Sequence, residues 1–128
     1  MTIKVIHTKT RPSTDVDFGH IPSEVNMKDY LDFYKSREVK AISREEQISP
    51  DGLTMIIIAR YNSIDDYLME DVEGPARDSS WQLIKSARMN LGLTDSFQVL
   101  DEDNDQIIDG PSINARISTL IAEGQIPN

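Results

Sequence analysis

The sequence predicts a single α+β domain in which a split βαβ motif forms an antiparallel sheet. Three observations support this fold class. Apolar side chains follow periods of two and of 3.6 residues in the chain order strand, helix, hairpin, helix, strand. A turn with Pro, Asp and Gly, over residues 49–52, marks the hairpin. A length of 128 residues suits one domain with a substantial core.

The hairpin between Val39 and Tyr61 is the best-defined local pattern. Its first strand is polar between Ile42 and Ile48, which is typical of an edge strand whose charges discourage unwanted pairing. Its second strand, Leu53 to Tyr61, alternates apolar residues on both faces. A strand of that kind needs cover on both sides.

The first strand and the first helix are expected before the hairpin. Alternating apolar residues predict a strand from about Thr2 to Lys9, again with two apolar faces. Proline, glycine and aspartate residues predict a loop from Arg11 to Pro22. Apolar residues at helical spacing, after a cap at Asn26, predict a helix from about Met27 to Arg37.

The second half of the chain contains the remaining elements. Ser63 caps a short helix that ends at Gly74-Pro75, and a longer helix runs from about Ser79 to Leu91. A strand around Phe97 and Val99 and a very short one at Ile107 and Ile108 flank the acidic run Asp101 to Asp105. Ser112 is expected to cap the last helix, which ends near Gly124.

This order of elements resembles the ferredoxin-like domains and, with the hairpin sequence ISPDGLTMIIIARY, the dimeric α/β-barrel superfamily. The resemblance covers about Ile3 to Leu100. It implies a ferredoxin-like domain over residues 1–100, with its strands in the order fourth, first, third, second. Residues 101–128 then form an acidic turn and a C-terminal helix packed on the same domain. It also implies a homodimer that pairs two open sheet faces.

The hypothesis favoured by these patterns is a non-catalytic assembly or interaction protein, as a homodimer or as a subunit of a larger complex. The third strand would present either Ile56 and Ile58 or Leu53, Met55 and Ile57 to the open face. The interface is therefore expected within Met55, Ile56, Ile57 and Ile58. Acidic residues around the short helix can present a docking surface to a basic protein partner.

The alternative is a small-ligand binder or a monooxygenase-like enzyme of the same superfamily. Some members carry an Asn, Trp and His set in a cavity between sheet and helices, but the residues of this chain do not match that pattern. A pocket would be lined by aromatic and histidine side chains: His7, Tyr30, Tyr34, Tyr61 and Trp81. As single residues, His7 and Trp81 are more simply interpreted as structural.

The acidic run also partly matches a calcium loop, with Asp101, Asp103, Asp105 and Asp109 at positions one, three, five and nine. Position six is Gln106 instead of Gly, and position twelve is Ser112 instead of Glu. The pattern therefore favours a solvated acidic turn and leaves weak calcium binding as an alternative.

Composition excludes several other classes. A net charge of −9 without clustered basic residues opposes binding to nucleic acid and to anionic membranes. Zero cysteines exclude disulfides and thiolate chemistry, and the sequence has neither a signal peptide nor an apolar run long enough to span a bilayer. No phosphate loop, catalytic triad order or clustered histidine set is present, so no cofactor is expected. A cytoplasmic location is the expectation.

Overall fold

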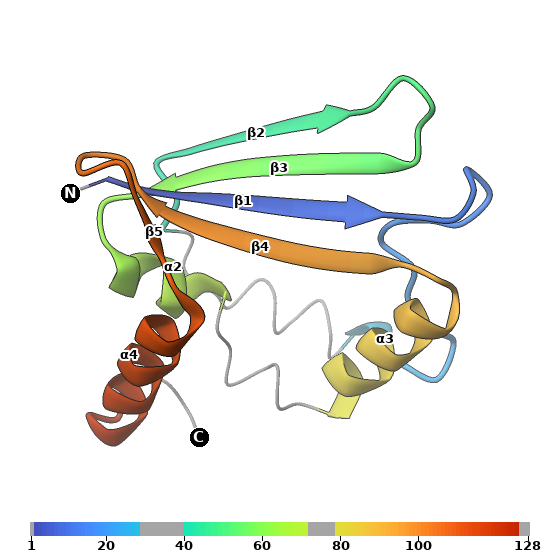
Figure 1. The fold of residues 1–128 in the computed structure, drawn as a ribbon. Coiled ribbons are helices and arrows are strands. Elements are labelled where there is room, and N and C mark those ends of the chain that lie inside the picture. Colours follow the sequence, from blue (N-terminus) through green and yellow to red (C-terminus); the bar gives the residue numbers. More distant parts are fainter. Residues whose placement is uncertain (1, 29–39, 72–78, 126–128) are drawn as a thin grey trace.

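The computed structural model describes residues 2–28, 40–71 and 79–125. They form one antiparallel sheet of five strands in the order β2-β3-β1-β4-β5, with three helices beside it (Figure 1). The α+β class and the antiparallel sheet are thereby confirmed. Most of the helix expected from Met27 to Arg37 lies outside the described residues, so the complete split βαβ motif stays a prediction.

The strands are β1 (Ile3–Thr10), β2 (Ser43–Ile48), β3 (Thr54–Tyr61), β4 (Thr94–Asp101) and β5 (Gln106–Ile108), and the helices are α2 (Ile64–Asp71), α3 (Ser79–Asn90) and α4 (Gly110–Ala122).

The β2–β3 hairpin closes through the expected turn. The amide of Gly52 donates to the Ser49 carbonyl over 2.9 Å, and Gly52 has a φ of 77° that a residue with a side chain rarely adopts. The Asp51 carboxylate accepts from the Ser49 hydroxyl at 2.6 Å and from the Leu53 amide at 2.9 Å. This local bonding fixes the register of β2 on β3, from Ser43 opposite Arg60 to Ile48 opposite Met55.

The core lies on one face of the sheet, between the strands and helices α2 and α4. Odd-numbered residues of β1, β3 and β4 point to this face because side chains alternate along a strand. Figure 1 shows the three labelled helices on the same side of the strands. The buried cluster contains Ile3, Val5, Ala59, Tyr61, Tyr67, Leu68, Val99 and Leu120.

Helices α2 and α4 are joined by a bidentate ion pair as well as by apolar packing. Arg116 of α4 donates through Nε and Nη2 to the two carboxylate oxygens of Asp65 on α2, each over 2.7 Å. The Ser63 hydroxyl accepts from the Asp66 amide at 3.2 Å, as expected for the cap of α2. The C-terminal helix is therefore tied to the rest of the core by both kinds of contact.

The start of α4 differs from the sequence expectation. Asp109, not Ser112, is the N-cap, and its carboxylate accepts from the Ser112 amide at 2.7 Å. The helix begins at Gly110 because Pro111 fits the first turn, where its missing N–H has no helical partner. Ser112 thus contributes its backbone amide, and the predicted start was three residues late.

The loop after β1 packs under α3 at the other end of the sheet. The Arg11 guanidinium donates to the Gly52 carbonyl at 2.7 Å and lies 4.3 Å above the Phe18 ring. Phe18 is buried, and Arg88 of α3 donates to the His20 carbonyl at 2.9 Å. The loop predicted from Arg11 to Pro22 is thus held against the hairpin turn and α3. Within the described ranges, no helix has the length and apolar character needed to cross a bilayer.

Replacing Leu120 with Ala tests the packing of α4. Leu120 is fully buried, so Leu120→Ala should lower the free energy of unfolding by about 3 kcal/mol through lost burial and a cavity. Leu83→Ala is the matched control, because Leu83 is 44% exposed and its loss should cost less than about 1 kcal/mol. Urea unfolding measures both. Equal effects of the two substitutions would contradict the described position of α4.

The Asp65–Arg116 pair should make stability depend on pH. Donation from Arg116 holds the pKa of Asp65 below its ordinary value. The Asp65 carboxylate therefore binds a proton more readily in the unfolded chain. The stabilisation from the Asp65–Arg116 pair is present above about pH 4 and is lost as pH falls through the pKa of Asp65 in the folded state. Asp65→Asn should lower the urea midpoint at pH 7, and its difference from the wild type should shrink towards pH 3. Asp66→Asn is the control, and a difference that does not change with pH would contradict the assignment.

Candidate functional site

The face of the sheet opposite the helices is the candidate interaction surface. Even-numbered residues of β1, β3 and β4 and odd-numbered residues of β2 point there, and among the described residues no helix covers it. Ile6 of β1 lies opposite Ile58 of β3, and Ile56 lies two register pairs further along opposite Thr8, at the next position on this face. All three isoleucines are only partly buried. They form an apolar centre on the neighbouring interior strands β1 and β3, which we call the isoleucine patch (Ile6, Ile56 and Ile58).

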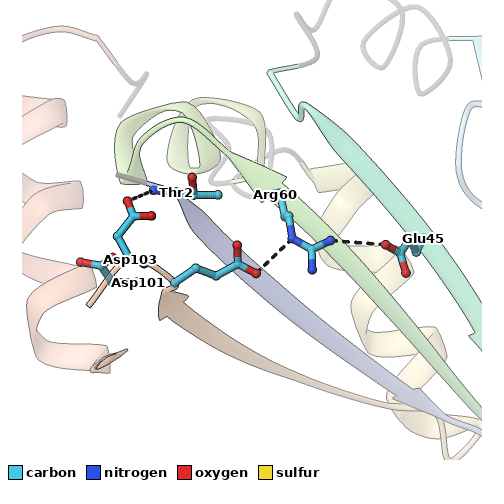
Figure 2. Close-up of polar contacts among 6 residues, drawn as sticks. Thr2, Glu45, Arg60, Asp101 and Asp103 are labelled. Carbon is cyan, nitrogen blue, oxygen red and sulfur yellow. Dashed lines mark hydrogen bonds and ion pairs between the residues drawn. The ribbon is translucent and has the colours of Figure 1, made fainter. Parts of the chain in front are cut away.

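Charged residues border one end of the isoleucine patch. The Arg60 guanidinium of β3 donates through Nε to Glu102 at 3.0 Å and through Nη1 to Glu45 of β2 at 3.3 Å. Figure 2 shows Arg60 between these two carboxylates, with Thr2 and Asp103 bonded nearby. Lys4 lies opposite Arg60 on β1. Donation to Glu102 and Glu45 raises the pKa of Arg60, so this end of the open face carries fixed charges of both signs.

The four residues expected at the interface divide between the two faces. Ile56 and Ile58 belong to the open face, whereas Met55 and Ile57 point towards the helices. Ile57 is 6% exposed, which removes it from any surface contact. Two further residues of the open face, Ile6 and Arg60, were not singled out as interface residues from the sequence. The pairing of β1 with β3 would have identified both, because it places them beside Ile58 and Lys4.

The residues expected to line a pocket are not brought together in the described part of the chain. Tyr30, Tyr34 and the side chain of Trp81 lie outside the described residues. His7 and Tyr61 share the helix-facing side but are about 13 Å apart along the strands, since four register pairs separate them. Tyr61 is 1% exposed, and its ring centroid lies 5.4 Å from that of Tyr67. Tyr61 is thus a core residue, and the ligand-binding alternative stays a hypothesis.

His7 takes part in a polar cluster with β4 that the sequence did not indicate. Its Nε2 atom lies 2.7 Å from Asp95 Oδ1, and its ring stacks on Phe97 with centroids 4.0 Å apart. The hydrogen bond from His7 lowers the pKa of Asp95, while burial lowers the pKa of the neighbouring Lys9. The pairing of β1 with β4 creates this cluster, because it sets His7 opposite Phe97 and Lys9 opposite Asp95.

The acidic residues from the end of β4 to the start of α4 accept hydrogen bonds within the chain or lie in the turn between β4 and β5. Asp101 is 7% exposed and accepts from the Asp103 amide at 3.1 Å and from Asn104 Nδ2 at 2.8 Å. These bonds, with the one from Asn104 largest, lower the pKa of Asp101. Asp103 accepts from the Thr2 amide at 2.7 Å, Asp105 has a φ of 50° in the turn, and Asp109 caps α4. In the residues that the structure describes, no three acidic, histidine or cysteine side chains are placed to hold a metal ion.

A calcium titration tests the acidic turn. Because Asp101 and Asp109 already accept backbone hydrogen bonds, we expect no saturable heat up to about 1 mM calcium, the affinity range of the weakest protein sites. The melting temperature should be equal in calcium and in chelator. A saturable signal that disappears in Asp105→Asn would contradict this expectation and would support the calcium hypothesis.

Comparisons with known proteins identify no family or relative, so the function is inferred from the geometry of the described residues. A scan against protein families and searches of curated proteins and of solved structures gave no match.

Proposed function

We propose that this chain is an assembly protein that forms a homodimer through the open face of its sheet. One observation carries the proposal: Ile6, Ile56 and Ile58 are neighbours on the adjacent interior strands β1 and β3, on the face that no described helix covers. Large β-branched side chains at the centre of a sheet face favour burial, and a contiguous apolar patch on a surface commonly marks an interface.

The dimensions of the face suit a partner of similar size. Five strands of up to eight residues give a flat footprint of about 500 Å², from the spacing of strands and residues. The surface buried per partner in a specific complex is about 800 Å², and it exceeds a flat footprint because side chains interdigitate. A flat second sheet face of the same shape therefore supplies about 60% of the contact area that a stable dimer needs, and interdigitating side chains add to it.

The charges around the patch favour a second copy over a strongly charged partner. Lys4 and Arg60 are basic, while Glu45 and Glu102 are acidic, and all four border the same face. A face with both signs can match itself under a twofold rotation, because basic groups of one copy then meet acidic groups of the other. A uniformly basic partner would repel Lys4 and Arg60 at this surface.

Introducing a charge into the isoleucine patch should separate the two copies. Ile56→Lys should weaken the dimer at least about thirtyfold, the effect of losing an interface residue worth roughly 2 kcal/mol. Sedimentation equilibrium over a dilution series measures the dissociation constant. Met89→Lys is the control, because Met89 is 74% exposed on α3 and adds the same charge away from the sheet.

Folding must be measured alongside assembly. Circular dichroism and urea unfolding should show that Ile56→Lys retains the fold, and Ile56→Thr, which keeps the β-branched shape, should have an intermediate dissociation constant. A folded wild-type chain that sediments as a monomer at every concentration would overturn the homodimer. Association that is equally strong in the wild type and in Ile56→Lys, in every step that the dilution series resolves, would overturn the use of this face.

A further inference from the structure

The edge strand β2 is a second surface that the open face does not explain. All six of its side chains are exposed, and among the described strands it pairs only with β3. The Ser49 amide donates to the Thr54 carbonyl at 2.9 Å, in the same register as the strand pairs. Hydrogen bonding in an antiparallel pair alternates along the strand, so the odd-numbered residues of β2 turn their backbone groups to β3. The backbone groups of Arg44, Glu46 and Ile48 consequently point away from β3, towards the free edge of β2.

The sequence of β2 is complementary to itself when a second copy runs antiparallel. With Glu45 at the twofold axis, Arg44 of one copy lies opposite Glu46 of the other, and the reverse pair repeats the contact. Ser43 lies opposite Gln47. The backbone N–H and C=O groups of Arg44 and Glu46 both point away from β3. The two residues can therefore form a hydrogen-bonded pair between the copies.

Other registers are less favourable. A slip by two residues in one direction places Arg44 opposite Arg44, and a slip in the other direction places Glu46 opposite Glu46. Like charges directly opposite each other destabilise a strand pair, and each slip also loses both Arg44–Glu46 pairs, which in the proposed register outweigh the single like pair of Glu45 with Glu45. A slip by one residue brings residues bonded to β3 opposite outward ones, which breaks the hydrogen-bond alternation. The charges of this edge thus oppose pairing in general but permit one arrangement.

We propose that β2 is an edge-to-edge interface on which a second copy of this chain adds its own β2, antiparallel and centred on Glu45, to give a continuous ten-stranded sheet. The two Glu45 side chains meet at the axis, and Arg60 of each copy, 3.3 Å away, offsets part of their repulsion. The proposal does not depend on the open face. If both interfaces form, the assembly contains more than two copies.

Single cysteines test the register directly, because the chain contains none. In Glu45→Cys the two introduced thiols oppose each other in a non-hydrogen-bonded pair, whose Cα atoms are about 4.5 Å apart, within the range of a disulfide. A Cys at position 43 is about 13 Å from its copy and cannot bridge. Under mild oxidation, Glu45→Cys should cross-link at least about tenfold faster than Ser43→Cys or Gln47→Cys. A tenfold difference corresponds to a preference of about 1.4 kcal/mol for the register centred on Glu45. An equal mixture of Ser43→Cys and Gln47→Cys should form the heterodimer.

Charge reversal separates contacts between copies from those within one. Arg44 and Glu46 also approach each other within a chain, at 3.8 Å, so a single substitution alone is ambiguous. Arg44→Glu and Glu46→Arg should each weaken edge pairing by about tenfold, because two favourable pairs become repulsive. An equal mixture of the two variants should recover the association, since both pairs between positions 44 and 46 then have opposite charges, while Glu45 stays opposite Glu45 as in the wild type. An effect confined to one chain would not be recovered by mixing.

The same measurements in the Ile56→Lys background distinguish this interface from the open face. Cross-linking through Glu45→Cys should persist there, while dimerisation through the isoleucine patch is lost. If Glu45→Cys cross-links no faster than the two neighbouring variants, or if mixing the charge variants restores nothing, the edge pairing is overturned. Loss of the open-face dimer alone leaves both edge results unchanged.

Discussion

One-sided burial is the constraint on which the rest of this structure depends. Helices α2 and α4 place their apolar side chains against the odd-numbered residues of β1, β3 and β4, and the fully buried Ile3, Leu68 and Leu120 meet in that layer. Burial of such side chains is the main favourable term in folding. Because the described helices contact only this face, the even-numbered isoleucines of β1 and β3 have no partner layer there. The apolar character of β1 and β3 on both faces thus connects the internal core with the proposed assembly surface.

Much of the fold could be predicted from local sequence, because turn and edge preferences act over a few residues. The Pro-Asp-Gly turn, the polar edge strand and the Ser63 cap are of this kind. The start of α4 was misplaced because Asp109 and Ser112 are both good caps, and Pro111 decides between them. Assigning Met55 to Ile58 to faces required the sheet itself, since a strand apolar on both sides gives alternation no preferred direction. The His7–Asp95 contact likewise depends on which strand neighbours β1, which no local pattern specifies.

Arg60 connects the two surfaces that are proposed for assembly. It lies on β3 beside the isoleucine patch, and its guanidinium also contacts Glu45 of the edge strand and Glu102 beyond β4. Exposed ion pairs of this kind contribute little to stability. Their value here is positional, because a planar guanidinium with several donors holds two carboxylates in fixed directions. The placement of Glu45 near the proposed axis is therefore set by the same residue that defines the charged end of the open face.

The central position of β1 has a consequence for how the chain folds. Its partners are β3, about fifty residues later, and β4, which ends at Asp101. Contacts between distant segments require closure of long loops before they gain any stabilisation, and sheets of this kind fold more slowly than helical bundles. During synthesis the first strand leaves the ribosome without a partner, and its two apolar faces stay solvated until most of the chain has followed. The β2–β3 hairpin is the template that can form earlier. β1 would then add to its inner strand β3, and β4 would add to β1.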